Sequence, residues 1–225
     1  MLKLTKELDK KFKSAVSVLE NDDKFRIITH YDADGISAAS VLALTMMKAQ
    51  KGFHVRFVEK VPEKIPTSLP LIFTDIGNSH LKRISEQEVP VIILDHHYVP
   101  DNINGERDDH VYINPHDLGI DGAREVSGGT LSLILSTVYD DINWDLAIYG
   151  LSGAAADKQN INGFVGLNSD ILKEAIKREK ILVKEGLYID GDNIKDALMK
   201  ACDPYFPTIS GREDRIDELL KKIGI

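Results

Sequence analysis

Residues 25–37 read FRIITHYDADGIS, a short apolar run followed by three polar residues at alternate positions. The run FRIIT predicts a buried strand, and ISAASVLALTMMKAQK at 36–51 predicts the helix that follows it. His30, Asp32 and Asp34 stand between the two elements, where the predicted strand ends. A strand, a polar turn and a helix in this order are typical of the opening unit of an α/β fold.

Three further apolar runs end in residues that can carry chemistry. They are LIFT (71–74) before Asp75, VIIL (91–94) before Asp95-His96-His97, and VYI (111–113) before Asn114-Pro115-His116. Strands that alternate with helices predict a doubly wound, mostly parallel sheet with flanking helices. Such sheets bind ligands beyond the carboxyl ends of their strands, so we expect all four polar clusters at one edge.

The ends of the chain show helical patterns. Residues 1–20 predict an amphipathic helix, and a helical C-terminal part follows residue 126. Its predicted helices are VSGGTLSLILSTVYD (126–140), NWDLAIYGLSGAAAD (143–157), SDILKEAIKREKILVKEG (169–186), and shorter ones near 192–201 and 213–223. We expect a catalytic α/β domain over 1–160 and a helical extension over 161–225. Within the extension, DPYFPTISGRED (203–214) is the best boundary candidate, because proline, glycine and charge cluster there.

Composition narrows the class of protein. The 225 residues are 43% hydrophobic and carry a net charge of −8, which disfavours a general duplex-binding surface. A carboxylate site can still become positive once cations bind to it. No run of about 18 uncharged apolar residues occurs, so we expect no membrane span and no membrane partner. The N-terminus lacks the apolar core of a signal peptide, and Cys202 is a single cysteine, so we predict a cytoplasmic protein.

Two known aspartate motifs could account for the pattern of residues 30–35. A calcium loop is excluded, because the twelfth position counted from His30 is Val41 rather than glutamate. A phosphatase of the haloacid-dehalogenase type would use Asp32 as nucleophile, Thr74 as its threonine and Gly191-Asp192-x-x-x-Asp196 as its magnesium motif. The last motif is equally typical of a turn before a helix. This hypothesis also leaves Asp95-His96-His97 unexplained.

The sequence Asp95-His96-His97 points to a metal site. Two adjacent histidines behind a carboxylate, at the end of a strand, are rarely all structural. A metal-bound imidazole commonly donates its second N–H to an oriented acceptor, a role open to Asp95. With the aspartates of the other strand ends, the set offers oxygen and nitrogen ligands, which suit manganese or a similar divalent ion.

The order of these residues resembles the DHH phosphoesterase superfamily. The motifs are His30-x-Asp32-x-Asp34-Gly35, then Asp75, then Asp95-His96-His97, then Asp157 in GAAADKQ. Within the superfamily the chain is most similar to RecJ-like exonucleases, in particular the archaeal branch that includes the GINS-associated nuclease. INPHDLGIDG (113–122) also resembles that branch.

The resemblance implies a two-metal phosphodiesterase with Mn²⁺, or Mg²⁺, as its cofactor. Asp75 would bridge the ions, His30 and Asp32 would hold one of them, and Asp34, His96 and Asp157 would hold the other. His97, together with Asp95, would act in catalysis at the scissile phosphate, by stabilising charge or by protonating the leaving oxygen.

The resemblance also implies partners and alternatives. The expected substrate is single-stranded DNA or RNA, and GINS-like replication proteins are possible partners. A phosphoesterase for small nucleotides or short oligonucleotides stays open. A non-catalytic replisome scaffold of the same fold would have lost metal ligands, whereas the full set is present here. The glycine-rich, substrate-gripping second domain of the family is not found before Ile225.

Three weaker features complete the predicted site. Ser127, Gly128 and Gly129 open a helix, whose N–H groups could hold a phosphate or form an ordinary N-cap. Asn114 and His116 could contact substrate, although Asn114-Pro115 is also typical of a plain turn. The lysines at 173, 177, 180 and 184 would share one helical face, which could follow a nucleic-acid backbone or simply face solvent.

Overall fold

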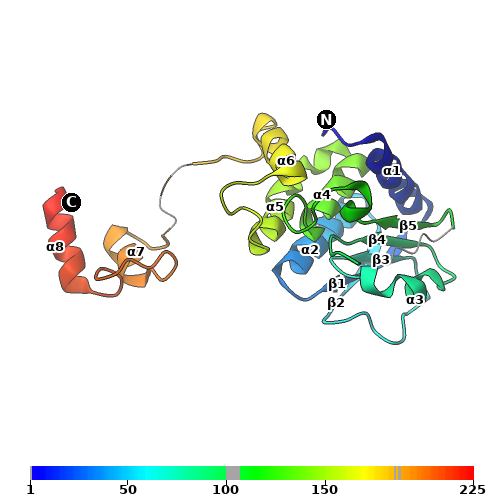
Figure 1. Ribbon diagram of the computed structural model, residues 1–225, viewed down its shortest axis with the longest axis horizontal. Coiled ribbons are helices and arrows are strands. Elements are labelled where there is room, and N and C mark those ends of the chain that lie inside the picture. The colour runs from blue at the N-terminus through cyan, green and yellow to red at the C-terminus, as the bar shows by residue number, and fades with distance from the viewer. Residues whose placement is uncertain (1, 100–106, 185, 187–188) are drawn as a thin grey trace. The chain divides into compact units, whose positions relative to one another are not determined.

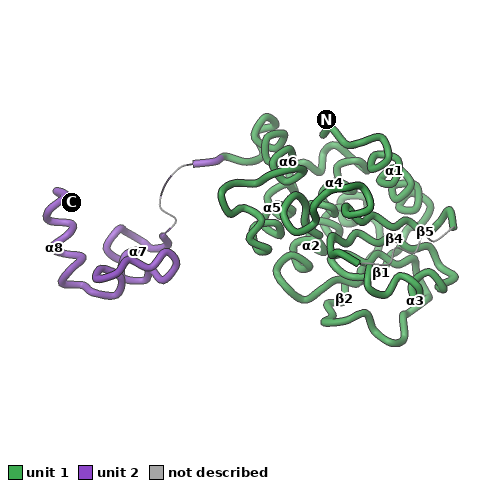
Figure 2. The backbone as a smooth tube through the Cα atoms, viewed as in Figure 1, with its two compact units in different colours: residues 1–182 green, residues 183–225 purple. Residues whose placement is uncertain are grey.

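The computed structural model describes residues 2–99, 107–184, 186 and 189–225. The chain divides into two compact units, Met1–Leu182 and Val183–Ile225, which are described separately (Figure 2). None of the helices in the described ranges has the length and apolar content needed to cross a membrane.

The first unit contains a five-stranded parallel sheet (Figure 1). Its strands are β1 (Lys24–His30), β2 (Gly52–Val58), β3 (Leu71–Thr74), β4 (Val91–Leu94) and β5 (His110–Ile113), in the spatial order β2-β1-β3-β4-β5. Thr29 pairs with Thr74, and Leu94 pairs with both Thr74 and Ile113. Four strands therefore end level with one another. The predicted α/β sheet is confirmed, and its polar clusters all follow the same edge.

β2 is a strand that the sequence analysis missed. It lies at the edge of the sheet and, among the described strands, pairs only with β1. None of its seven residues is buried, so it lacks the continuous apolar run that marks β1, β3 and β4. Exposure on an edge removes the pattern by which a buried parallel strand is recognised.

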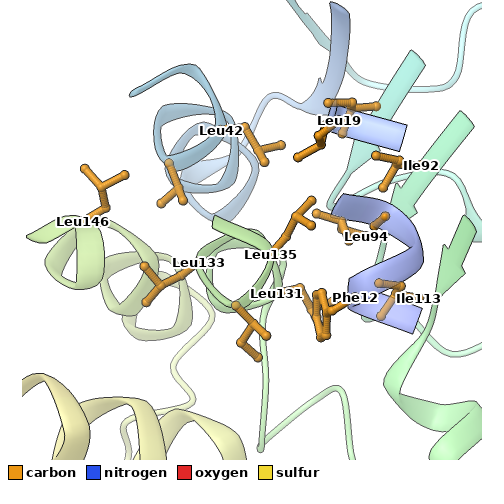
Figure 3. Close-up of a cluster of buried hydrophobic side chains, with 14 of the residues drawn as sticks. Phe12, Leu19, Leu42, Ile92, Leu94, Ile113, Leu131, Leu133, Leu135 and Leu146 are labelled. Atoms are coloured by element: carbon orange, nitrogen blue, oxygen red, sulfur yellow. The ribbon is translucent and has the colours of Figure 1, made fainter. Parts of the chain in front are cut away.

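Alternate strand residues face two separate hydrophobic cores. The larger core joins Ile27, Ile72 and Ile92 to the helices on one face. These are α1 (Lys6–Asn21), α2 (Ala33–Lys48), α4 (Gly128–Tyr139), α5 (Ala147–Ala156) and α6 (Gly166–Lys177). Figure 3 shows Phe12, Leu42 and other apolar side chains of these helices meeting strand residues such as Ile92, Leu94 and Ile113.

The opposite face of the sheet has a thinner cover. Ile28, Phe73 and Ile93 point into a smaller core, which is covered by Leu81 and Ile84. The last two residues belong to the short helix α3 (Leu81–Ser85), which follows a turn of 3₁₀ helix, η1 (Asn78–His80). Two further 3₁₀ segments are η2 (Pro115–Leu118), which follows β5, and η3 (Asp141–Leu146), which lies between α4 and α5. The sheet is thus covered on both faces, as a doubly wound fold requires.

α6 is shorter than the sequence predicts. It ends at Lys177, Glu179 takes a left-handed conformation (φ 57°), and the Lys180 N–H bonds back to the Ala175 carbonyl. This is a common way for a helix to terminate. Because Lys180 and Lys184 lie beyond the helix, the prediction of one face that carries four lysines is wrong.

The residue that follows α6 packs against the rest of the first unit. The Arg178 guanidinium lies 5.0 Å from the centroid of the Trp144 ring and pairs with Asp141. The first unit therefore extends past residue 160, to Leu182. The second unit contains α7 (Ile194–Lys200) and α8 (Glu213–Ile223), which pack through a small core of Leu198, Ile216 and Leu220. The segment 203–214 follows α7 and runs into the first two residues of α8.

Candidate metal centre

The level strand ends bring six predicted ligands to one place. His30 is the last residue of β1, Asp32 caps α2 and Asp34 lies in the first turn of α2. Asp75 follows β3 and His96 follows β4, while Asp157 caps the C-terminus of α5. Asp34 therefore stands on a helix rather than in a loop, because α2 begins at Ala33, earlier than predicted.

One group of candidate ligands consists of His30, Asp32 and Asp75. His30 Nδ1 lies 2.7 Å from Asp32 Oδ2 and 3.7 Å from Asp75 Oδ2. Asp75 holds the left-handed conformation (φ 56°), which is uncommon outside glycine and recurs where function demands a particular side-chain direction. The three residues offer ligand atoms within 4.8 Å of one another.

A second group surrounds His96. Its Nε2 lies 3.2 Å from Asp75 Oδ1, 3.5 Å from Asp34 Oδ2 and 3.4 Å from Asp157 Oδ2. Asp34, His96 and Asp157 again offer ligand atoms within 4.8 Å of one another. Asp75 contributes one carboxylate oxygen to each side, so the two groups meet at this residue.

The chemistry of these atoms fits divalent cations. His30 Nδ1, His96 Nε2 and both carboxylate oxygens of Asp75 are buried and make no hydrogen bond of good geometry among the described residues, despite the short contacts between these groups and the one to Asp32. His96 Nδ1 lies 2.7 Å from the Gly122 carbonyl, which can only accept, so this nitrogen carries the proton. In the neutral ring Nε2 then presents its lone pair to the carboxylates. A buried lone pair among unpaired carboxylate oxygens is a suitable ligand set for Mn²⁺ or Mg²⁺.

Asp34 is held by the N-terminus of α4. Its carboxylate accepts hydrogen bonds from Ser127 Oγ (2.8 Å) and from the N–H groups of Gly128 (2.6 Å) and Gly129 (2.9 Å). A Cβ atom on Gly153 would lie only 2.1 Å from Asp34 Oδ1, so α5 needs glycine at this close approach. The predicted phosphate site at 127–129 is therefore replaced by a carboxylate site. The ordinary N-cap is also present, since Ser127 Oγ accepts from Thr130 N.

Asp95 orients His97 and not His96. Asp95 Oδ1 lies 2.7 Å from His97 Nδ1 and also accepts from the His97 N–H. The acceptor behind His96 is the Gly122 carbonyl, so within the histidine pair Asp95 is the partner of His97. With Nδ1 engaged, His97 offers Nε2, and its side chain is 56% exposed. His97 also offers a ligand atom within 4.8 Å of those of Asp75 and His96.

Two asparagines fix the loop that carries the histidine pair. Asn78, which the sequence analysis missed, donates its backbone N–H to Asp95 Oδ2 and its amide to the Asp95 and His97 carbonyls. Asn114 is buried, donates to the His97 carbonyl and caps η2. Asn114 therefore supports the loop that carries the histidine pair. The His116 ring packs edge-on against Tyr98, with centroids 5.5 Å apart.

Crowded carboxylates shift the ionisation of the cluster. Burial, reinforced by the charge of Asp34, raises the pKa of Asp75 to about 8. Burial and the same charge raise the pKa of Asp157 to about 6. Burial opposes protonation of His96, but the carboxylates of Asp75 and Asp34 outweigh it and raise the pKa of the imidazole to about 10. Without a cation, the cluster keeps protons to offset its negative charge.

Cation binding is therefore expected to release protons. Metal ligands must be deprotonated, so Mn²⁺ affinity should rise from about pH 6 to about pH 8, where Asp157 and then Asp75 lose their protons, and should rise further towards about pH 10, where His96 loses its proton. Isothermal titration of Mn²⁺ in two buffers with different ionisation enthalpies measures the number of protons released. Equal heats in both buffers, or an affinity independent of pH, would contradict this electrostatic description.

The structure gives local roles to the aspartates that the haloacid-dehalogenase alternative would use. Asp32 accepts from the Gly35 N–H as the cap of α2, and Asp192 and Asp196 lie in the second compact unit. There Asn193 caps α7, and Asp196 accepts from the Asp192 N–H. The run 191–196 is thus a turn followed by a helix N-terminus, the alternative that the sequence left open.

The sheet and the ligand cluster define an α/β domain with a candidate site for divalent cations at the carboxyl ends of its strands. Residues 24–149 match the model of the DHH family, N-terminal domain, and the chain belongs to that family. The match includes five of the six predicted ligands, whereas Asp157 lies just beyond it.

Comparison with known proteins gives one curated relative and similar solved structures. An uncharacterised protein of Methanocaldococcus jannaschii is 29% identical over 239 residues, covering all of this chain and 54% of the relative, so the chain spans about half its length. A structure of exonuclease RecJ bound to manganese matches 79% of this chain and 49% of its own, with TM-score 0.61 and 21% identity. RecJ of Thermus thermophilus in complex with Mn²⁺ matches 79% and 28%, with TM-score 0.59 and 22% identity.

Proposed function

We propose that this domain hydrolyses phosphodiester bonds of single-stranded DNA or RNA from one end, using two divalent cations. The main support for the proposal is that the two carboxylate oxygens of Asp75 face two different groups of ligands. Its Oδ2 faces His30, and its Oδ1 faces His96, from which the second ligand group extends. A buried carboxylate with both oxygens unpaired between two ligand groups is suited to bridge two ions.

The residues of the chain have distinct tasks in this reaction. When bound, a pair of divalent cations lowers the pKa of a shared water and offsets charge on the phosphate. His30 and Asp32 hold one side of the site, and Asp34, His96 and Asp157 hold the other. His97, oriented by Asp95, stabilises charge on the transferred phosphoryl group or gives a proton to the leaving oxygen.

The surface beside the site supports a nucleic-acid substrate. A cavity of about 310 Å³ opens next to Asp75 and His97 and is also lined by Lys60, His80 and Tyr98. A second cavity of about 440 Å³ shares Ser79, His80 and Val99 with the first and adds Lys82 and Arg83. Lysine and arginine side chains in these cavities could bind the phosphates of a strand, and the exposed Tyr98 ring offers a surface on which a base can stack.

Digestion of end-labelled oligonucleotides tests the proposal. Single strands of DNA and of RNA, labelled at either the 5′ or the 3′ end, are incubated with Mn²⁺, Mg²⁺ or a chelator. We expect stepwise shortening with metal and none with chelator, because the carboxylate cluster needs cations to act on an anionic ester. The label that is released first gives the direction of digestion.

The length dependence separates the two forms of the proposal. Hydrolysis confined to mono- and dinucleotides would reassign the domain to small nucleotides, the alternative that the resemblance leaves open. Metal-independent hydrolysis, or internal cuts in circular single strands, would overturn the exonuclease assignment.

A further inference from the structure

The turn after α5 carries a buried amide that the proposed reaction does not use. Gln159 is 6% exposed, and its Nε2 donates to the Gly122 carbonyl (3.0 Å) and the Val126 carbonyl (3.2 Å). Its Oε1 accepts from Nδ2 of Asn168, a fully buried residue of α6 (2.6 Å). Carbonyls only accept, so the two bonds to them fix the orientation of the Gln159 amide.

Both carbonyls lie next to the predicted ligands. The Gly122 carbonyl is also the acceptor for His96 Nδ1, at 2.7 Å. Val126 immediately precedes Ser127, whose hydroxyl donates to Asp34. The segment from Gly122 to Val126 has no regular helix or strand to hold it. Its position therefore depends on side-chain contacts such as those from Gln159.

Gly122 lies in close contact with the loop that carries His96, so a movement of Gly122 would move that loop. A Cβ atom placed on Gly122 would lie 2.0 Å from the His96 carbonyl, so the two backbones touch. Asn168 ties the same segment from the other side, because its backbone N–H donates to the Glu125 carbonyl. Displacement of this segment would rotate His96 Nε2 away from the carboxylates that it faces at 3.2–3.5 Å.

We infer that Gln159 is a positioning residue for the metal centre, acting on His96 through the Gly122 carbonyl. The inference rests on the proposed function in one respect, namely that His96 binds a cation. Partners behind a metal-bound histidine fix the ring and commonly change metal affinity about 10- to 100-fold when they are removed. Gln159 would have this effect indirectly, because the Gly122 carbonyl lies between its amide and the His96 ring.

Mn²⁺ binding to the full chain tests the inference without any turnover. Free Mn²⁺ is followed by electron paramagnetic resonance during titration of the wild type, Gln159→Glu and Gln159→Met, both of which lose the amide donor. We expect one of two ions to bind about 10-fold or more weakly in both variants. Asn143→Asp is the matched control, because Asn143 is a buried amide that donates to the Ser136 carbonyl away from the site. Its Mn²⁺ affinity should be unchanged.

The same titration in a His96→Ala background shows whether the effect passes through His96. Adding Gln159→Met should then weaken binding no further, since the ring that Gln159 positions is gone. A further loss as large as in the wild-type background would overturn the route through His96. Unchanged Mn²⁺ binding in both Gln159 variants would overturn the inference itself.

Hydrogen exchange of the His96 Nδ1 proton, measured by NMR on the metal-free protein, separates this inference from the proposed function. We expect faster exchange in Gln159→Met and unchanged exchange in Asn143→Asp. If the wild type bound no Mn²⁺, the proposed function would fail, and equal exchange in Gln159→Met and wild type would still overturn the role of Gln159.

Discussion

Replacing Asp75 by asparagine is expected to reduce Mn²⁺-dependent hydrolysis by at least about 1,000-fold, because a bridged pair of cations supplies several kcal/mol of transition-state stabilisation. Both carboxylate oxygens of Asp75 are buried and unpaired, and they face His30 on one side and His96 on the other. An amide keeps the shape but loses the charge and one acceptor. The initial rate on a labelled single strand and the number of Mn²⁺ ions bound should fall together.

The fold should survive this substitution. Asparagine tolerates the left-handed backbone of residue 75 (φ 56°) better than alanine does. The sign of the pH effect also favours the variant. The pKa of Asp75 rises from about 3.8 to about 8 on folding, so ionising it costs stability as pH rises through this window. The metal-free variant should therefore unfold no earlier than the wild type at about pH 8.

An exposed aspartate gives the matched control. Asp145 pairs with Lys48 at the surface, so Asp145→Asn makes the same chemical change and should leave hydrolysis and Mn²⁺ binding intact. If Asp75→Asn kept its activity within about 10-fold of wild type, the bridging role would be excluded, since a bridge cannot be lost at that small a cost.

The sequence predicts the part of the site that is local to strand ends. Buried parallel strands appear as continuous apolar runs, and the residue after each run must lie at the carboxyl edge of the sheet. Asp75 and the pair His96-His97 could therefore be placed from two short runs, LIFT and VIIL. Asp157 could not, because it follows a helix and its position depends on how α5 packs against α2 and α4. Only the family resemblance indicated it.

Contacts between residues that are far apart in the sequence could not be predicted from local sequence patterns. Residues 127–129 read equally well as a phosphate site, and their donors were assigned to Asp34 only once α2 and α4 were seen to meet. Gln159 and Gly122 are separated along the chain, and no periodicity relates an amide to a distant carbonyl. The predicted length of α6 is wrong for a local reason. Helical periodicity continues through KREKILVKEG, but a left-handed residue at 179 ends the helix.

The histidine pair should divide into a ligand and a catalyst. His96→Ala is expected to weaken Mn²⁺ binding, because His96 Nε2 is buried and unpaired between three carboxylates. His97→Ala should keep both ions and lower kcat by about 100-fold or more, the usual contribution of a positioned acid or charge stabiliser. His54→Ala is the matched control, since His54 is an exposed histidine on β2, outside the site.

The pH profile distinguishes the role of His97 from that of a third ligand. The hydrogen bond to Asp95 raises the pKa of His97 above its usual value, so the imidazole keeps its proton to a higher pH than an unpaired histidine does. If this proton serves the reaction, the rate should fall as pH rises above that pKa, and the fall should vanish in His97→Ala. To bind metal through Nδ1, His97 would have to give up its 2.7 Å contact with Asp95. Loss of Mn²⁺ in His97→Ala, with retention in His96→Ala, would show that the two roles are reversed.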